Sequence, residues 1–410
     1  MKTAMSGSRW FGRFTAAVGA AALGLLVTGC EPECVDQFDC AKKGAAGEGK
    51  RYACVDSRCV MQDTDAGTDA GVSCTDLPHD PKLGTLQLQT GYAAAESAAI
   101  PEGIGAVTVI QSGSDYKLYG LRGTDNSLYA LGTWPNVALG AAPLQAVIPE
   151  ADRGNNTFPS GYLTNDGTRL LTGYTKGETG FPGKVLVYDT VTPANTTYVS
   201  AAGNLSAAGV PGAFFINGLG IEGVSGSAAA IYSLNTASSP FEGSKLAAFP
   251  ATDASSGYTA VTADKVAVLG YGVPDKSSSD PFAPFINHLL AVAPSVYSQA
   301  ISGKTTLTLG PSNAPEIYSG NDVQAVSGFG SGVALHRGTY TATHDVSRIE
   351  VTLGGITADT VTAGELKPVL TTNSNDNACT NVVSMTSMGP DLLVGVKDKN
   401  GRRLVRIQKQ

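Results

Sequence analysis

The chain has 410 residues, with 28 lysines and arginines against 35 aspartates and glutamates, and its formal net charge is −7. This acidic balance argues against nucleic acid as a partner and against docking to anionic lipid through basic patches. Charged residues make up 15% of the chain and there are 50 glycines, whereas an average soluble domain has about 25% charged residues. We therefore expect turn-rich β structure rather than amphipathic helices.

Residues 1–29 have the pattern of a secretory signal. Lys2, Arg9 and Arg13 precede an uncharged stretch at 14–28, the order of a charged region and an apolar region in such signals. As a helix this stretch would span about 22 Å, less than the roughly 30 Å hydrocarbon layer, so we expect no retained membrane span. Removal of the three basic residues would take the net charge from −7 to −10.

The apolar stretch ends in Val27-Thr28-Gly29-Cys30, which resembles the lipobox of bacterial lipoproteins. The resemblance implies that the Cys30 thiol receives a diacylglyceryl group, that the precursor is cut before Cys30, and that the new amino terminus is acylated, with palmitate among the chains. Two or more acyl chains hold a protein stably to a bilayer. We expect an anchor in the cell envelope, at the outer membrane, periplasmic or surface-exposed. The alternative is an ordinary signal, with Cys30 in a disulfide.

Six further cysteines remain, an even number that suits disulfide bonding in an oxidising compartment. Four of them lie within the short segment 30–60, and two stand apart. The four are Cys34, Cys40, Cys54 and Cys59, and the other two are Cys74 and Cys379. Because segment 30–60 has few apolar residues, we expect a small module stapled by two disulfides among the four, whose pairing is open. Zinc is the alternative, but the gaps differ from C-x-x-C pairs.

Residues 61–73 contain the unit Thr-Asp-Ala-Gly twice and are expected to be a flexible linker. Asp63, Asp65 and Asp69 do not form an EF-type calcium loop, since the required glycine and closing glutamate are missing. An anchor followed by a cysteine-rich module and an Asp-Ala-Gly linker resembles bacterial surface lipoproteins of the myxobacterial type.

Residues 74–410 contain six strand–turn–strand units, each with two β-rich runs around a turn of glycine, asparagine, aspartate or proline. The six begin at Asp115, Thr168, Ala213, Asp264, Ser331 and Asp391. Their start-to-start spacings lie between 45 and 67 residues, near the spacing of propeller blades and well below that of tandem immunoglobulin-like sandwiches. We predict an all-β fold, a six- or seven-bladed β-propeller preceded by the small disulfide-stapled module. It resembles the divergent YncE-like and quinoprotein-like propellers.

A propeller closes when a strand from one terminus completes the blade built by the other. Residues 84–90 are the predicted closing strand, and Tyr92–Ala99, rich in alanine, is the best helix candidate. Cys74 precedes the first of these segments and Cys379 precedes the final hairpin. We therefore predict a Cys74–Cys379 disulfide that holds the ring shut. The chain-entropy model gives about 5 kcal/mol for so long a loop, as an upper figure.

The sequence contains no complete catalytic or cofactor motif, so we predict no catalytic, cofactor-binding or metal-ligating residues. The histidines are His79, His288, His336 and His344. They form no H-E-x-x-H pattern, and no G-x-S-x-G elbow is present. Ser302–Thr305 reads S-G-K-T, but the first glycine of a phosphate loop is replaced by Ser298. Trp134 is the one tryptophan after residue 29, too few for quinone-cofactor blades.

These observations predict a non-catalytic binding or scaffolding propeller, with recognition by rim loops such as 270–285. Its expected partners are the membrane, through Cys30, and another envelope or surface protein or a glycan. The alternative is a calcium-dependent hydrolase or lyase of the lactonase-like kind, with calcium in the central channel. Candidate oxygen ligands are Asn217, Glu222, Asp264, Asp322 and residues 371–379, which form no fingerprint.

Overall fold

The structure is a computed structural model that describes residues 50–55, 58–63, 74, 77–154, 156–276, 285–321, 323–340, 345–353, 361, 364–371 and 379–410. The signal segment, Cys30, Cys34, Cys40 and most of the predicted linker lie outside the described residues. Two compact units are present, the first at 1–77 with 280–282 and the second at 78–279 with 283–410. In the part that the structure describes, no helix has the length and apolar character to cross a bilayer.

The first unit contributes an antiparallel hairpin of β1 (Lys50–Val55) and β2 (Arg58–Asp63). Its register places Cys54 directly opposite Cys59. Cys59 is disulfide-bonded, so it is not the free thiolate that a zinc site would need. Val60 and Met61 leave 43% and 46% of their surface exposed. Two apolar side chains of β2 are therefore largely exposed to solvent.

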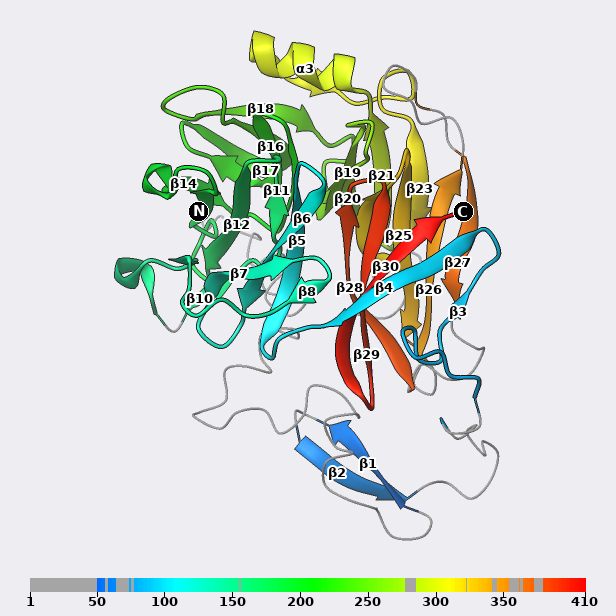
Figure 1. Ribbon diagram of the computed structural model, residues 1–410. Helices are drawn as coiled ribbons and strands as arrows, with labels where there is room; N and C mark the ends of the chain where they lie inside the picture. Colours follow the sequence, from blue (N-terminus) through cyan, green and yellow to red (C-terminus); the bar gives the residue numbers. More distant parts are fainter. Residues whose placement is uncertain are drawn as a thin grey trace, which may run out of the picture. The chain divides into compact units, whose positions relative to one another are not determined.

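The second unit contains, in its described residues, five mainly antiparallel sheets, and the ten-stranded one spans two blades, so that we distinguish blades 1 to 6 in chain order (Figure 1). Blade 1 consists of β5 (Ile104–Ser112), β6 (Asp115–Arg122), β7 (Ser127–Thr133), β8 (Asn136–Val137) and β9 (Gln145–Ala146). Blade 2 consists of β10 (Thr157–Pro159), β11 (Thr164–Asn165), β12 (Arg169–Lys176), β13 (Gly183–Asp189) and β14 (Thr197–Ala202). Short 3-10 turns, η3 (Glu150–Asp152) and η4 (Pro193–Asn195), flank strands of blade 2.

Blades 3 and 4 follow the same plan. Blade 3 consists of β15 (Ser206–Val210), β16 (Ala213–Ile221), β17 (Val224–Asn235), β18 (Glu242–Ala248) and the parallel β22 (Leu307–Thr308). Blade 4 consists of β19 (Ser255–Val261), β20 (Ala267–Pro274), β21 (Phe285–Val292) and β23 (Glu316–Gly320). Two residue pairs between β14 and β16 join blades 2 and 3 into one continuous sheet.

Blades 5 and 6 each take their last strand from the N-terminal part of the second unit. Blade 5 consists of β24 (Val323–Phe329), β25 (Gly332–Tyr340), β26 (Asp345–Leu353), β27 (Glu365–Thr371) and β3 (Gln87–Leu88). Blade 6 consists of β28 (Thr380–Met388), β29 (Asp391–Asp398), β30 (Gly401–Lys409) and β4 (Tyr92–Ala99). Counted from the inner strand of each blade, which in blade 2 is β11, the six predicted hairpins correspond to the second and third strands.

The first strands of the blades form a closed ring of inner strands. Contacts run from β5 to β11, β15, β19, β24 and β28 in turn, and β28 contacts β5 again. Each of these strands pairs on one side only and is thus an edge of its sheet. A ring of sheets whose inner edges surround one axis is a β-propeller. The predicted fold is confirmed, with six blades.

Hydrophobic clusters fill the spaces between consecutive blades in the described part of the chain. Leu171 of blade 2 packs with Phe214 of blade 3, and Leu118 of blade 1 packs with Leu393 of blade 6. Each side chain is at most 1% exposed, and burying one contributes about 1.5–3 kcal/mol. Because both faces of a blade are covered, central strands such as β16 and β29 are buried along most of their length rather than at alternate positions.

The ring is closed by β4, which pairs antiparallel with β30 at the C-terminal end of the chain (Figure 1). The helix predicted at Tyr92–Ala99 is therefore wrong, since these residues form β4. Residues 84–90 supply only β3, which pairs with β27 of blade 5 and not with the final hairpin. Helix propensities differ by less than about 1 kcal/mol per residue. The hydrogen bonds that β4 forms with the edge of β30 outweigh this small preference for a helix.

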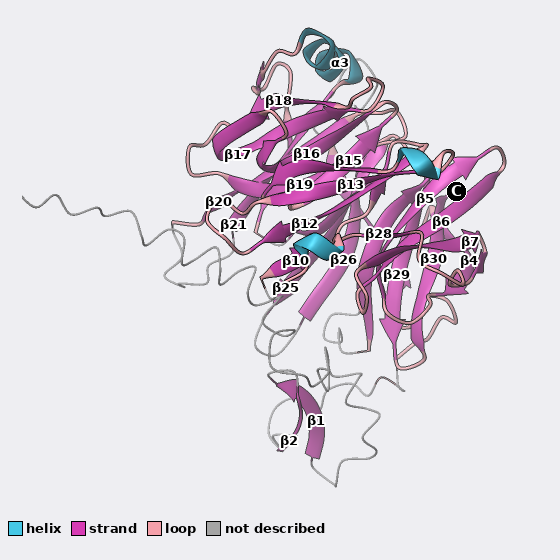
Figure 2. Ribbon diagram, turned by 90° about the vertical axis from the view of Figure 1, so that its left-hand side faces the viewer, coloured by secondary structure: helices cyan, strands magenta, loops and turns pink. Residues whose placement is uncertain are grey.

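The longest spacing between hairpins is explained by an insertion between β21 and β23. It contains β22 and the helix α3 (Pro294–Gly303), which contacts β18 and is seen beside it in Figure 2. α3 was not predicted from the sequence, although its proline at the first turn is a typical start signal. Ser302–Thr305 lies at the C-terminal end of α3. A phosphate loop instead precedes a helix N-terminus, so this segment is not one.

Candidate functional site

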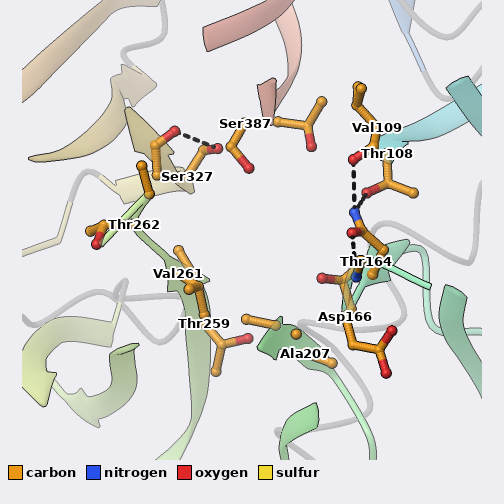
Figure 3. A pocket seen from close by; sticks show the side chains of 18 of the residues that line it. Thr108, Val109, Thr164, Asp166, Ala207, Thr259, Val261, Thr262, Ser327 and Ser387 are labelled. Carbon is orange, nitrogen blue, oxygen red and sulfur yellow. Dashed lines mark hydrogen bonds between the residues drawn. The ribbon is translucent and has the colours of Figure 1, made fainter. Parts of the chain in front are cut away.

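A cavity of about 280 Å³ lies on the axis of the second unit, and residues of all six inner strands line it (Figure 3). Its lining is rich in hydroxyl groups, contributed by one or two residues of each inner strand except β15 and by one threonine that follows β19. They are Thr108, Thr164, Thr259, Thr262, Ser327, Thr386 and Ser387. Glycine and apolar residues make up most of the remaining lining, together with Gln111, Asn165, Asp166 and Lys265. We call this space the channel cavity.

Glycines allow the inner strands to approach one another closely around the channel cavity. A Cβ atom on Gly209 of β15 would lie 2.0 Å from the carbonyl oxygen of Asn165 on β11. One on Gly328 of β24 would lie 2.1 Å from the carbonyl oxygen of Val261 on β19. Both distances are far below contact distance. The narrow ring of inner strands thus depends on the absence of a side chain at these two positions.

Several lining hydroxyls are held by neighbouring groups of the protein. Thr108 accepts a hydrogen bond of 2.8 Å from the amide Nδ2 of Asn165, which also donates to the carbonyl oxygen of Val109 (Figure 3). Thr262 accepts one from the backbone N–H of Val266, and Thr259 donates to Ser206 at 3.3 Å. These bonds fix the orientation of one part of the lining.

Three other hydroxyls are left available to a ligand. Thr164, Thr386 and Ser387 line the channel cavity and are half-buried. Their side chains form no hydrogen bond with any residue that the structure describes. A serine or threonine hydroxyl can donate one hydrogen bond and accept two. These side chains therefore offer both donors and acceptors toward the axis, from two different blades.

Asp166 is the one carboxylate among the described lining residues, and its oxygens are already used inside the protein. Oδ1 accepts hydrogen bonds from the N–H groups of Thr168 and Arg169, at 2.9 and 2.7 Å, and from the Thr168 hydroxyl. Oδ2 accepts one from the hydroxyl of Thr236 on blade 3. Figure 3 shows the carboxylate turned away from the middle of the cavity. Asp166 thus stabilises the turn before β12 and the contact between two blades.

The candidate calcium ligands do not meet in the described structure. Asn217 lies fully buried on β16, where its Nδ2 donates to the carbonyl oxygen of Gly270 at 2.6 Å. Glu222 is exposed in the turn between β16 and β17, and Asp264 is exposed in the turn between β19 and β20. Asp322 and residues 372–378 lie outside the described residues. Among those described, no three histidine, cysteine, aspartate or glutamate side chains are grouped as a metal site.

The described histidines lie in three separate environments. His288 Nδ1 lies 2.6 Å from Glu316 Oε2 and 3.4 Å from Ser319 Oγ, and its ring stacks on Tyr271. A serine–histidine–acid relay uses both ring nitrogens, whereas both contacts here are at Nδ1. His79 lies 3.8 Å from Asp398. Burial lowers the pKa of His336 on β25 to about 4, so that this ring is neutral at pH 7. His344 lies outside the described residues.

Among the cysteines predicted to form disulfides, the structure describes Cys59, Cys74 and Cys379 as bonded. Cys74 and Cys379 are each disulfide-bonded, and Cys379 is buried at the start of β28. Each of these two cysteines is therefore oxidised, and the pairing of Cys74 with Cys379 stays a prediction. The side chain of Cys54 lies outside what the structure describes, so the pairing within the module also stays open.

The hydroxyls of the channel cavity were not singled out by sequence reasoning. The signal was present but weak: each predicted hairpin is preceded by a short run that mixes serine or threonine with small aliphatic residues, such as "GYTAVT" at 257–262 and "VSMTSM" at 383–388. Such runs become recognisable as inner strands only when the blade order is known.

No protein-family model matches the chain, and no curated protein matches it. Among solved structures, BamB from Moraxella catarrhalis is similar at 11% identity, with 73% of this chain and 71% of that chain covered and a TM-score of 0.31. The β-propeller domain of the Trilobed protease from Pyrococcus furiosus is similar at 11% identity, with 76% and 79% covered and a TM-score of 0.35. The tricorn protease is similar at 9% identity, with 87% and 36% covered and a TM-score of 0.36. The propeller assignment itself rests on the strand pairing and on the ring of inner strands.

Proposed function

We propose that this chain is a lipid-anchored propeller of the bacterial cell envelope that binds another envelope component without transforming it. The observation that carries the proposal is the channel cavity, where available hydroxyls face the axis while Asp166 is used inside the protein. Such a surface can form hydrogen bonds with a ligand. The one carboxylate in its described lining, that of Asp166, accepts hydrogen bonds from Thr168, Arg169 and Thr236 and is not free to act as a general acid or base.

The anchoring part of the proposal rests on the sequence. A basic start, an uncharged stretch and the ending Val27-Thr28-Gly29-Cys30 together support acylation at Cys30. The segment at 61–73 would then act as a spacer between the membrane and the propeller. The proposed location is the outer membrane, periplasmic or surface-exposed.

The proposed partner is a protein or a glycan of the envelope. The experiment that tests it is chemical cross-linking in intact cells, followed by capture of the lipidated chain and identification of what is attached. Reproducible recovery of one partner, absent when the chain is captured from cells lacking cross-linker, is the expected result. Recovery of nothing beyond abundant envelope proteins would count against a binding role.

The competing proposal is a calcium-dependent hydrolase or lyase. It predicts tightly held calcium in the purified chain and turnover of lactones or esters that stops on chelation. Metal analysis of the detergent-solubilised protein, together with a lactone and ester panel, decides between the two. Bound calcium with chelator-sensitive turnover would replace the binding proposal.

A further inference from the structure

We propose that the channel cavity binds a small, neutral, hydroxyl-bearing molecule of the size of a monosaccharide. This inference rests on the proposed binding function and names the chemical class of its ligand. The cavity, at about 280 Å³, is slightly smaller than the roughly 300–1,000 Å³ of typical small-molecule sites. It suits one sugar ring rather than an extended oligomer.

The donors and acceptors of the channel cavity match those of a polyol. Thr164 on β11 and Thr386 and Ser387 on β28 present hydroxyls that form no hydrogen bond within the described protein. A sugar hydroxyl, like a serine hydroxyl, both donates and accepts. Two such groups can therefore pair in either direction, so the site tolerates several hydroxyl orientations. The inner strands, as edges of their sheets, add backbone amides and carbonyls that face the axis.

The charges around the channel cavity argue against an ionic ligand. A cation would need free carboxylates, but the oxygens of Asp166 are bonded to Thr168, Arg169 and Thr236. An anion would need converging cations or helix N-termini, but Lys265 is the one cation in the described lining, and it is exposed in a turn. A purely apolar ligand would leave the three available hydroxyls without partners, which costs free energy.

The lining is rigid enough to position a ligand. All three available hydroxyls lie on strands, Thr164 on β11 and Thr386 and Ser387 on β28. Threonine side chains also have few χ1 rotamers. Asn165, which follows Thr164 on β11, is held by Thr108 and Val109 of blade 1. β11, which carries Thr164, is therefore held by β12 on one side and by blade 1 on the other. A preorganised site loses less entropy on binding.

The test is a binding measurement on the lipidated chain in a detergent without a sugar headgroup. The probes are glucose, galactose, mannose and N-acetylglucosamine, with calcium chloride and inorganic phosphate as ionic probes. Ligand-observed NMR and calorimetry should show at least one neutral sugar bound, and neither ion bound at the axis. Thr164→Val, Thr386→Val and Ser387→Ala should each weaken that binding about 2- to 10-fold, the usual effect of one neutral hydrogen bond.

Thr124→Val is the matched control, because Thr124 is exposed in the turn between β6 and β7 and does not line the cavity. It should leave binding unchanged. Absence of binding by all four sugars, equal binding by the cavity variants and wild type, or binding of calcium or phosphate that the cavity variants weaken would each overturn the inference. Circular dichroism confirms that the variants are folded. Capture of an envelope partner without any sugar binding would overturn this inference and leave the proposed function intact.

Discussion

The carboxylate of Glu96 on β4 accepts a hydrogen bond of 2.6 Å from the indole Nε1 of Trp134, which follows β7 of blade 1. Arg406 of β30 donates to the same carboxylate at 3.3 Å. β4, which closes blade 6, is thus hydrogen-bonded to blade 1 as well as to β30 of its own sheet. The hydrogen bond from Trp134 is the main cause that lowers the pKa of Glu96.

Glu96→Gln should therefore weaken ring closure in a pH-dependent way. Because the folded-state pKa of Glu96 is lowered, its stabilisation is fully present above the unfolded pKa of about 4.5 and is lost as pH falls through the folded value. We expect a loss of about 1 kcal/mol in the free energy of unfolding at pH 7, since the side chain is partly exposed. Thermal unfolding at pH 7 and pH 3 measures it. Glu102→Gln, at an exposed turn position, is the control, and an equal effect of both variants would contradict the role of Glu96.

Gly328→Ala should destabilise the ring of inner strands. The new Cβ would lie 2.1 Å from the carbonyl oxygen of Val261, so β19 and β24 would have to move apart, at a cost of about 1–3 kcal/mol. Gly105→Ala on β5 is the matched control, because a Cβ there meets no atom within 4 Å. Urea unfolding followed by fluorescence compares the two. A Gly328 variant as stable as the Gly105 variant would show that the inner strands are not closely packed.

His336 should make the protein less stable as pH falls from about 6.5 to about 4. Burial lowers its folded-state pKa to about 4, so in this range the unfolded chain takes up a proton that the folded chain does not. The expected decrease attributable to this residue is about 3 kcal/mol, since each unit of pKa difference corresponds to about 1.4 kcal/mol. His336→Gln should remove that part of the pH dependence, whereas His79→Gln, at a more exposed position, should retain it. Identical pH profiles for the His336 variant and the wild type would contradict the assignment.

The Cys74–Cys379 disulfide can be tested directly. Proteolysis without reductant, followed by mass spectrometry, should yield a peptide that joins the two cysteines and that disappears on reduction. Cys74→Ala with Cys379→Ala should lower the thermal midpoint while leaving the circular dichroism spectrum unchanged, since such a bond acts mainly on the unfolded chain. A peptide that joins Cys379 to Cys34, Cys40, Cys54 or Cys59 would contradict the predicted pairing.

Cys30→Ala should abolish lipid anchoring. If the cut before residue 30 depends on an acylated cysteine, the variant should accumulate as an unprocessed precursor. The intact mass of the wild-type membrane form should show a diacylglyceryl group and an acylated amino terminus. Cys34→Ala is the control, since that cysteine is expected in the disulfide-stapled module, and it should remain lipidated. An unmodified Cys30 thiol in the wild type would contradict the lipoprotein interpretation.

The sequence by itself determined the parts of this protein that depend on neighbouring residues. Each of the six hairpins is a local unit, because both of its strands and its turn lie within about 30 residues and their apolar runs and turn residues are readable together. The spacing of the hairpins then indicated a propeller. The lipid anchor proposed at Cys30 likewise rests on one contiguous segment, and it stays a prediction.

The tertiary structure alone decided what depends on residues far apart. Tyr92–Ala99 has helical propensity, yet it forms β4 because the open edge of β30, some 300 residues later, provides its hydrogen-bonding partners. The channel cavity brings together Thr164 and Thr386, whose positions in the chain differ by more than 200 residues. No local pattern encodes either relationship. Both arise because closing the ring pairs β4 with the outer edge of β30 and makes the inner strands of all six blades face a common axis.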